Sequence, residues 1–551
     1  MSEAHQNISS VPLTRLGSLS VASDRVLTIA TAAIVSVCFG IGIWLQQQVH
    51  LNHDVGWIVH TAGWMLEGRR FGSDIVDVNP PLIWFLSLPA AWIVRMGWLA
   101  EPEAIRVYIW TLCFGSLAFC YRLLAPMRRE GRQADAAILI VGIAFVCTVL
   151  AGKCFGQREF ISFVAGMPYC LAIAGRIEFG TKYSRRSMVV CGVLAGVAFG
   201  FKPWLLSVPF LLELVYLVHR RDLRAVPRTE NVTLGLFLTG YVLLALVLTP
   251  DYFTVTLPLA ASVYWIYGRA GFDLLYGYLA TTLGPLLICS GVMIAIIRRV
   301  NAYVRVLLAA LVGFLLNYWM QGKGFDYHLY PALAACVTLT AYLCLQVCSE
   351  IMAARWLQAS FGVRCAMVAT LIIVLGTHLV EPVQQVRYWF IRDGTTTGWL
   401  WNLREGVIRR VTELSNGKSP RIYAFSTHPY PAFPTMSYVR GHWVGRQLAQ
   451  FAIAGHIRLP LIEDAEKRRR MKEGVAMQRA MVIEEFLASE PDIVLINTVA
   501  PKILDPSFPQ FDYIEYFSSD PRFAALWKQY AEVKGSNEIR IFVRNGWDSG
   551  S

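Results

Sequence analysis

The chain of 551 residues is poor in charge: only 16% of its residues are Asp, Glu, Lys or Arg, whereas 55% are hydrophobic and the mean hydropathy is +0.45. About a quarter of the residues of a typical soluble protein are charged, so an ordinary soluble enzyme is excluded. All twelve cysteines lie before residue 382, and their spacing forms no CxxC or Cys/His pattern. Neither a disulfide framework nor a structural zinc site is therefore indicated. The sequence predicts a polytopic α-helical membrane protein.

The composition changes after Glu381. Residues 1–381 contain 28 Lys/Arg and 20 Asp/Glu, whereas residues 382–551, a much shorter stretch, contain 22 and 18. The first part is typical of a membrane domain and the second of a globular domain. We expect a cytoplasmic segment at 1–25, a transmembrane domain at 26–381 and an extracytoplasmic α/β domain at 382–551.

Hydropathy predicts eleven membrane spans, because a spanning helix needs about 20 mainly apolar residues. No small-residue cleavage site follows the first span, which indicates a retained anchor. The expected spans are Val26–Leu45, Arg106–Leu124, Asp135–Ala151, Phe160–Arg176, Met188–Phe201, Trp204–Val218, Val232–Thr249, Leu274–Ile297, Val304–Trp319, Leu329–Val347 and Cys365–Val380.

Lys and Arg favour the cytoplasmic side of a membrane protein. With the N-terminus inside, the cytoplasmic loops and helix ends hold nineteen of the 28 basic residues of 1–381. An odd number of spans then places the C-terminal domain outside, in the periplasm of a Gram-negative host, with the chain in the inner membrane. The net charge of +12 is thus mainly a topology signal, and no nucleic-acid partner is expected.

The first external loop, 46–105, is much longer than a simple connection and is expected to be functional. Its apolar stretches Val55–Leu66 and Leu82–Trp98 predict two surface helices. Asp54 follows the first span directly, and a carboxylate so close to lipid is costly unless it is paired or faces a wet cavity. We therefore expect Asp54 to be functional, the alternative being a solvated loop aspartate.

The histidines near Asp54 could suggest a metal site, but His50, His53 and His60 match no strong ligand spacing. We interpret them as interfacial side chains. No cofactor is predicted, and a divalent metal remains an option that no motif supports.

Three further external turns, 152–160, 201–204 and 321–331, carry cations on the side where basic residues are disfavoured. These cations are Lys153, Arg158, Lys202, Lys323 and the neighbouring His328. A phosphate or diphosphate head group needs fixed positive charge and donors at this depth. The alternative is that the cations pair with Glu159, Asp326 or lipid phosphate.

The aspartate after the first span, the long first loop, the Asn79-Pro80-Pro81-Leu82 element, the many spans and the external tail together resemble the GT-C glycosyltransferases. Within these, the chain is most similar to bacterial relatives of protein O-mannosyltransferase and of the lipid A aminoarabinose transferase. The resemblance covers residues 27 to about 381. It implies transfer of a sugar from a polyprenyl-phosphate donor to a lipid, glycan or protein acceptor on the outer face.

The resemblance also implies that Asp54 is a general base or orients the acceptor. The family often has an acidic pair here, whereas His53 and Val55 flank Asp54, so Asp74 or Asp77 is a candidate second carboxylate.

The chemistry supports the same assignment, since a carboxylate can take the acceptor's proton and cations can stabilise departing phosphate. We expect Arg158, Lys202 and Lys323 to bind the donor phosphate, with help from His328 or Tyr327 and with Glu159 as a further candidate.

The tail contains three short β-rich runs, at 421–426, 492–497 and 538–543, and a long charged helical stretch at 463–489. We interpret the Ser-Thr-His-Pro-Tyr-Pro segment at 426–431 as a plain turn. Two rival functions remain, a polysaccharide polymerase or ligase and a lipid-linked glycan transporter. No internal repeat supports a transporter, and the late external loop is short for a polymerase.

Overall fold

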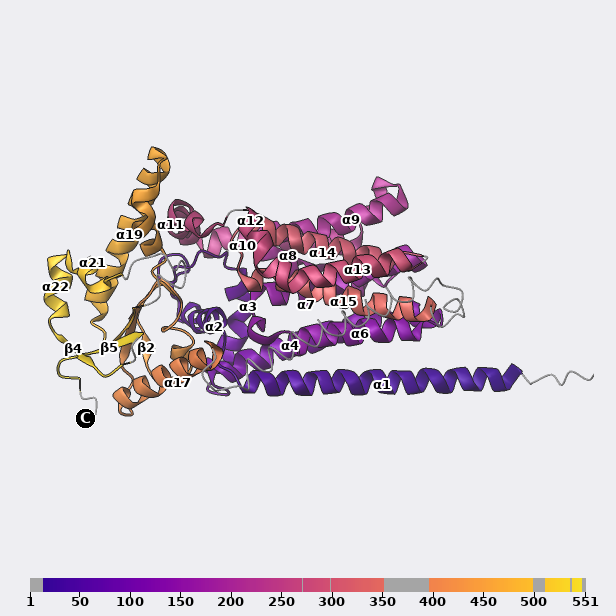
Figure 1. Ribbon diagram of the computed structural model, residues 1–551, viewed down its shortest axis with the longest axis horizontal. Helices are drawn as coiled ribbons and strands as arrows, with labels where there is room; N and C mark the ends of the chain where they lie inside the picture. The colour runs from indigo at the N-terminus through magenta and orange to yellow at the C-terminus, as the bar shows by residue number, and fades with distance from the viewer. Residues whose placement is uncertain are drawn as a thin grey trace, which may run out of the picture.

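The computed structural model describes residues 13–269, 271–297, 299–350, 396–498, 511–535 and 538–547. A bundle of long helices forms one end of the molecule, and a mixed α/β domain forms the other (Figure 1). The predicted eleventh span, 365–380, lies outside the described residues.

The bundle consists of apolar helices of different lengths. They are α1 (Leu13–Gln47), α4 (Glu101–Leu123), α5 (Ala125–Arg129), α6 (Gln133–Thr148), α7 (Arg158–Phe179), α8 (Arg185–Gly200), α9 (Ser207–Arg220), α10 (Thr229–Leu248), α11 (Leu257–Val263), α12 (Gly271–Leu274), α13 (Gly284–Ile296), α14 (Ala302–Gln321) and α15 (Asp326–Glu350). Seven helical stretches in the described part are long and apolar enough to cross a bilayer: those of α1, α4, α7, α10, α14 and α15, and the stretch that ends in α13. The spans expected at α6, α8 and α9 correspond to shorter helices.

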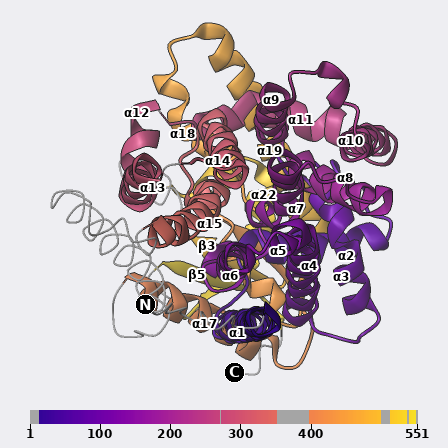
Figure 2. The same cartoon turned by 90° about the vertical axis from the view of Figure 1, so that its right-hand side faces the viewer.

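Helix α7 is the centre of the bundle. It packs against α4, α8, α14 and α15, and nearly all of its side chains are buried. The end-on view in Figure 2 shows α7 among these helices and α1 at the margin, where α1 packs on α6. The first two residues of α7, Arg158 and Glu159, are charged and buried, so the bundle needs partners for both at this end.

The first loop contains the two expected helices, α2 (His53–Leu66) and α3 (Leu82–Arg95). Asn52 caps α2, because its side chain accepts a hydrogen bond from the Asp54 N–H at 2.9 Å and so satisfies a donor of the first turn. The indole of Trp84 donates to the Thr61 hydroxyl at 2.9 Å and joins the two helices.

The C-terminal domain has a five-stranded sheet in the order β2-β1-β3-β5-β4, in which β1 is parallel to β2 and β3, and β5 is antiparallel to β3 and β4. Its strands are β1 (Arg421–Phe425), β2 (His442–Trp443), β3 (Ile493–Asn497), β4 (Tyr530–Val533) and β5 (Ile539–Arg544). Its helices are α17 (Thr396–Ser415), α18 (Ala452–Arg458), α19 (Ala465–Ser489), α21 (Tyr513–Ser518) and α22 (Pro521–Trp527). Alternate side chains along the strands face α17 on one side and α19, α21 and α22 on the other.

Candidate functional site

Asp54 lies in the first turn of α2, where the helix dipole favours a negative charge. One carboxylate oxygen lies 3.9 Å from Nη2 of Arg158, and the other lies 3.7 Å from Nε2 of His53. Only 18% of the Asp54 side chain is exposed. Burial raises the pKa of Asp54, and Arg158 opposes this shift. The carboxylate is therefore a better proton acceptor than a surface aspartate.

Lys202 and Glu159 form a buried ion pair beside Arg158. The Lys202 ammonium donates to Oε1 of Glu159 at 2.5 Å and to Oε1 of Gln321 at 2.6 Å. Nε2 of His328 lies 3.3 Å from the same ammonium and 3.6 Å from Glu159. Burial lowers the pKa of Lys202, and Glu159 opposes this shift. These contacts join the outer ends of α7, α8, α14 and α15.

Lys323 belongs to the same group of cations, although its nearest contact is aromatic. Its ammonium lies 3.4 Å from the ring centroid of Tyr264, a cation–π contact. Burial lowers the pKa of Lys323 to about 7, and repulsion from Lys202 and Arg158 adds to the shift. The three turns that carry the predicted cations thus converge. Tyr264 was not predicted, because nothing in its sequence context distinguishes it from a lipid-facing aromatic residue.

Asp77 is the second carboxylate near Arg158. It accepts hydrogen bonds from the Trp57 indole at 3.0 Å and from the backbone and side-chain nitrogens of Asn79 at 2.9 and 2.8 Å. Burial raises the pKa of Asp77, and Arg158 opposes this shift. Because Trp57 lies on α2, one turn after Asp54, Asp77 fixes the helix that presents Asp54.

The remaining candidates separate into two groups. The Tyr327 ring packs on His328 at 4.3 Å between centroids and interacts electrostatically with Asp54 and Glu159, so it belongs to the cluster. Asp74 instead accepts from the Arg70 N–H at 2.9 Å and closes a turn.

Two of the cations form the ion pairs that the pairing alternative predicted. Lys202 pairs with Glu159, and Lys153 pairs with Asp326. Half of the Lys153 side chain is exposed.

A segment of the C-terminal domain covers α2 next to Asp54. The His428 ring contacts the His53 ring at 5.2 Å between centroids, and Phe433 contacts Trp57 at 5.5 Å. The Tyr438 hydroxyl accepts a hydrogen bond from the Leu51 N–H at 2.9 Å. The segment that we interpreted as a plain turn therefore contacts the candidate site.

The other histidines of the first loop also have identified contacts. His50 packs on Tyr438 at 4.8 Å between centroids, and Nδ1 of His60 lies 3.0 Å from Oε2 of Glu101. Among the described residues, no group of three or more His, Cys, Asp or Glu side chains is arranged to hold a metal ion.

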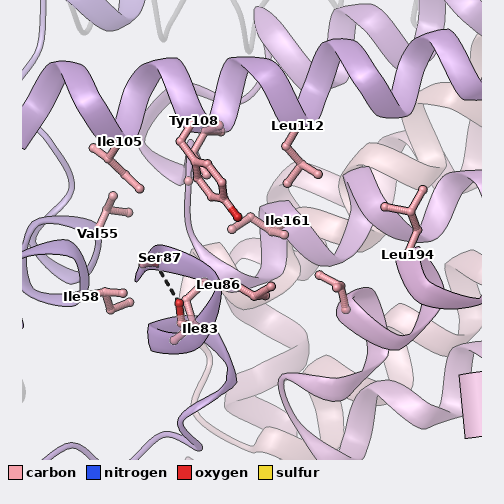
Figure 3. A pocket seen from close by; sticks show the side chains of 13 residues that line it. Val55, Ile58, Ile83, Leu86, Ser87, Ile105, Tyr108, Leu112, Ile161 and Leu194 are labelled. Carbon is pink, nitrogen blue, oxygen red and sulfur yellow. Dashed lines mark hydrogen bonds between the residues drawn. The ribbon is translucent and has the colours of Figure 1, made fainter. Parts of the chain in front are cut away.

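An apolar cavity of about 170 Å³ lies between α2, α3, α4, α7 and α8 (Figure 3). Val55 and Ile58 line it from α2, and three residues of α3 line it from the neighbouring helix. The lining side chains are Val55, Ile58, Ile83, Leu86, Ser87, Ile105, Tyr108, Ile109, Leu112, Ile161, Leu194 and Val197, together with Gly156. Leu86 of α3, Tyr108 and Leu112 of α4, and Leu194 and Val197 of α8 are only half-buried, so the cavity opens sideways where these helices line it.

Arg158 connects this cavity to the cations. Ile161, in the cavity wall, lies three residues after Arg158, so both side chains project from the same face of α7. Asp54 directly precedes the lining residue Val55, and Arg158 follows the lining residue Gly156 by two positions, so both charged residues lie beside the apolar cavity.

No protein-family model matches the sequence, and no curated protein matches it by sequence. By structure, the chain is similar to ArnT from Cupriavidus metallidurans in a crystal structure bound to undecaprenyl phosphate, with a TM-score of 0.56, 13% identity, and coverage of 95% of this chain and 99% of that chain. The apo state of the same protein gives a TM-score of 0.56, 12% identity and equal coverage. At a sequence identity this low, the similarity gives information about the fold alone. At that level the chain has the fold of ArnT, a helical bundle with a C-terminal sheet domain, as the resemblance predicted.

Proposed function

We propose that this protein is a membrane glycosyltransferase that moves a sugar from a polyprenyl-phosphate donor to an acceptor at the outer face of the inner membrane. The observation that carries the proposal is the position of Asp54 and Arg158 beside the buried cations and next to residues that line an apolar cavity. A lipid-linked sugar phosphate has this combination of an anion and a hydrocarbon chain.

The donor phosphate binds to Arg158, Lys202 and Lys323. The guanidinium is always charged and donates in a planar fork that suits phosphate. The pKa values of both lysines are lowered by burial, and an arriving anion favours their charged forms. The buried ammonium and guanidinium groups are held in place before the phosphate leaves, so they stabilise its developing charge without reorganisation.

Asp54 accepts the proton of the acceptor hydroxyl. The oxygen of that hydroxyl bonds to the anomeric carbon of the sugar, and the bond between that carbon and the phosphate oxygen breaks. Polyprenyl phosphate leaves with the electron pair, and the proton remains on Asp54. The raised pKa of Asp54 suits a general base.

The first isoprene units of the donor lie in the apolar cavity. The lining residues Ile105 and Leu112 are seven positions apart on α4, which corresponds to about 10 Å along the helix at 1.5 Å per residue. The cavity therefore leads from the phosphate-binding cluster into the hydrocarbon region. The ArnT crystal structure with bound undecaprenyl phosphate supports a donor of this class.

The experiment is transfer from a polyprenyl-phosphate sugar by the purified protein and its Asp54→Asn and Asp54→Ala variants. We expect both variants to lose at least about 100-fold in kcat, a typical contribution of a general base. Glu103→Gln is the matched control, because Glu103 is also a carboxylate in the first turn of a helix, α4, but its side chain is half exposed. Full activity of both Asp54 variants would refute the role of Asp54, and a wild-type protein that uses no such donor would refute the function.

A further inference from the structure

Helix α19 buries two polar side chains on one face. Gln478 and Glu485 are only 2% and 4% exposed, although most charged residues of α19 face solvent. They are seven residues apart and therefore lie on the same side of the helix. A buried carboxylate and amide are costly unless they are hydrogen-bonded, so their partners indicate what this face is for.

Both side chains hold one extended segment of the C-terminal domain. Oε2 of Glu485 accepts from the Arg446 N–H at 3.0 Å, and its Oε1 accepts from the Tyr423 hydroxyl. The Gln478 side chain donates to Oε1 of Gln447 at 2.5 Å. Hydrogen bonds from α19 thus hold the backbone of Arg446 and the side chain of Gln447.

The same segment holds the loop that carries Asp77. The Val76 N–H donates to the Arg446 carbonyl at 2.8 Å, and Val76 forms a parallel β-bridge with Gln447. The next residue is Asp77, whose carboxylate accepts from the Trp57 indole on α2. Hydrogen bonds and the short pieces of backbone between them therefore connect Glu485 to the helix that bears Asp54.

A close contact in the first half of α19 fixes the same helix against α11. A Cβ at Gly474 would lie 2.0 Å from the Ser262 hydroxyl and 2.7 Å from a Val263 methyl of α11, so only glycine allows this approach. Residue 264 follows α11 directly and supplies the ring that contacts Lys323. The face of α19 formed by Gly474, Gln478 and Glu485 thus reaches the elements that carry Asp77 and Tyr264.

We infer that Glu485 is a positioning residue for the transfer reaction: through Arg446 and Val76 it fixes the Asp77 loop, and through Trp57 it fixes the orientation of Asp54. The inference rests on the proposed function for its kinetic consequence but not for the hydrogen-bonded connection itself. The C-terminal domain is then part of the catalytic apparatus without touching the reacting atoms.

The experiment compares Glu485→Ala and Glu485→Gln in the full-length protein by hydrogen–deuterium exchange and by steady-state kinetics. Gln retains an oxygen that accepts from Arg446, whereas Ala leaves that N–H unpaired. We expect Glu485→Ala to speed exchange of the Val76 amide about tenfold or more, because local opening sets that rate. We also expect it to lower kcat about 100-fold, the usual effect of misplacing a reacting group by about 1 Å, with little change in the donor KM. Glu485→Gln should behave like the wild type.

Glu484→Ala is the matched control, since Glu484 is the neighbouring residue, is exposed and pairs with Arg522 at 2.8 Å. Val76→Pro removes the donor that joins Arg446 to the Asp77 loop and should reproduce the loss of kcat even if Glu485→Ala does not fold. Val76→Ala, which shortens the same buried side chain but keeps the N–H, is its control. Wild-type kcat in Val76→Pro, or unchanged Val76 exchange in a folded Glu485→Ala, would overturn the inference. Altered exchange in a protein with no transfer activity would instead refute the proposed function and leave only the hydrogen-bonded connection from Glu485 to the Asp77 loop standing.

Discussion

The ion pair of Lys202 and Glu159 allows a test that separates phosphate binding from structural support. Lys202→Met removes the ammonium and leaves the Glu159 carboxylate, 1% exposed, without its 2.5 Å partner. Removing one partner of a buried pair costs about 3–5 kcal/mol, so the thermal midpoint should fall. If the ammonium also binds the donor phosphate, that charge-assisted contact contributes about 1.5–3 kcal/mol, which corresponds to roughly 10–150-fold in Kd.

The double variant distinguishes these two effects. Adding Glu159→Gln to Lys202→Met removes the uncompensated carboxylate, and we expect most of the thermal stability to return. The affinity for polyprenyl phosphate should not return, because the ammonium is still missing. Thermal unfolding followed by tryptophan fluorescence, together with equilibrium binding of polyprenyl phosphate in detergent, measures both quantities. Lys182→Met controls for loss of an exposed lysine. A double variant that binds polyprenyl phosphate like the wild type would show that Lys202 only balances Glu159.

The other predictions concern Lys323 and the cavity. With a pKa of about 7, Lys323 is charged below pH 7 and loses its proton above it, so donor affinity should weaken from pH 7 to 9 by up to about tenfold per pH unit. Lys323→Gln should bind weakly at pH 7 and lack this part of the dependence; a wild-type pH profile in the variant would contradict the assignment. Leu194→Trp should fill the cavity and weaken binding of a long-chain donor by about tenfold or more, since each buried CH₂ contributes about 0.8 kcal/mol, while a donor with a single isoprene unit binds nearly as before. Val193→Trp, at a more exposed position of the same helix, is its control, and equal losses for both donors would argue against a chain in the cavity.

Much of this architecture follows from local sequence patterns. Hydropathy predicted the long helices, because each must be apolar over its whole length, and short β-rich runs predicted β1, β3 and β5. Strands β2 and β4 were missed, since β2 has only two residues and β4 alternates weakly in burial. Their existence depends on pairing with β1 and β5, which no local pattern encodes.

Some residues of the candidate site could likewise be predicted from the sequence, and others could not. Asp54 and the cations could be proposed because charge at that depth of the membrane is unusual. The contribution of Tyr264 and the approach of His428 to His53 could not be proposed, because each depends on how distant segments pack. The dual function of Asp77, beside Arg158 and bound to Trp57, likewise appears only when the loop and α2 are seen together.

The sideways opening of the cavity has a kinetic consequence for the proposed reaction. A donor that enters through this opening, and a polyprenyl phosphate that leaves through it, remain dissolved in the bilayer throughout the cycle. The substrate concentration that sets the rate is then the mole fraction of the donor in the membrane and not its molarity in water. Diluting the donor with inert lipid at constant bulk concentration should slow the enzyme, and adding water should not.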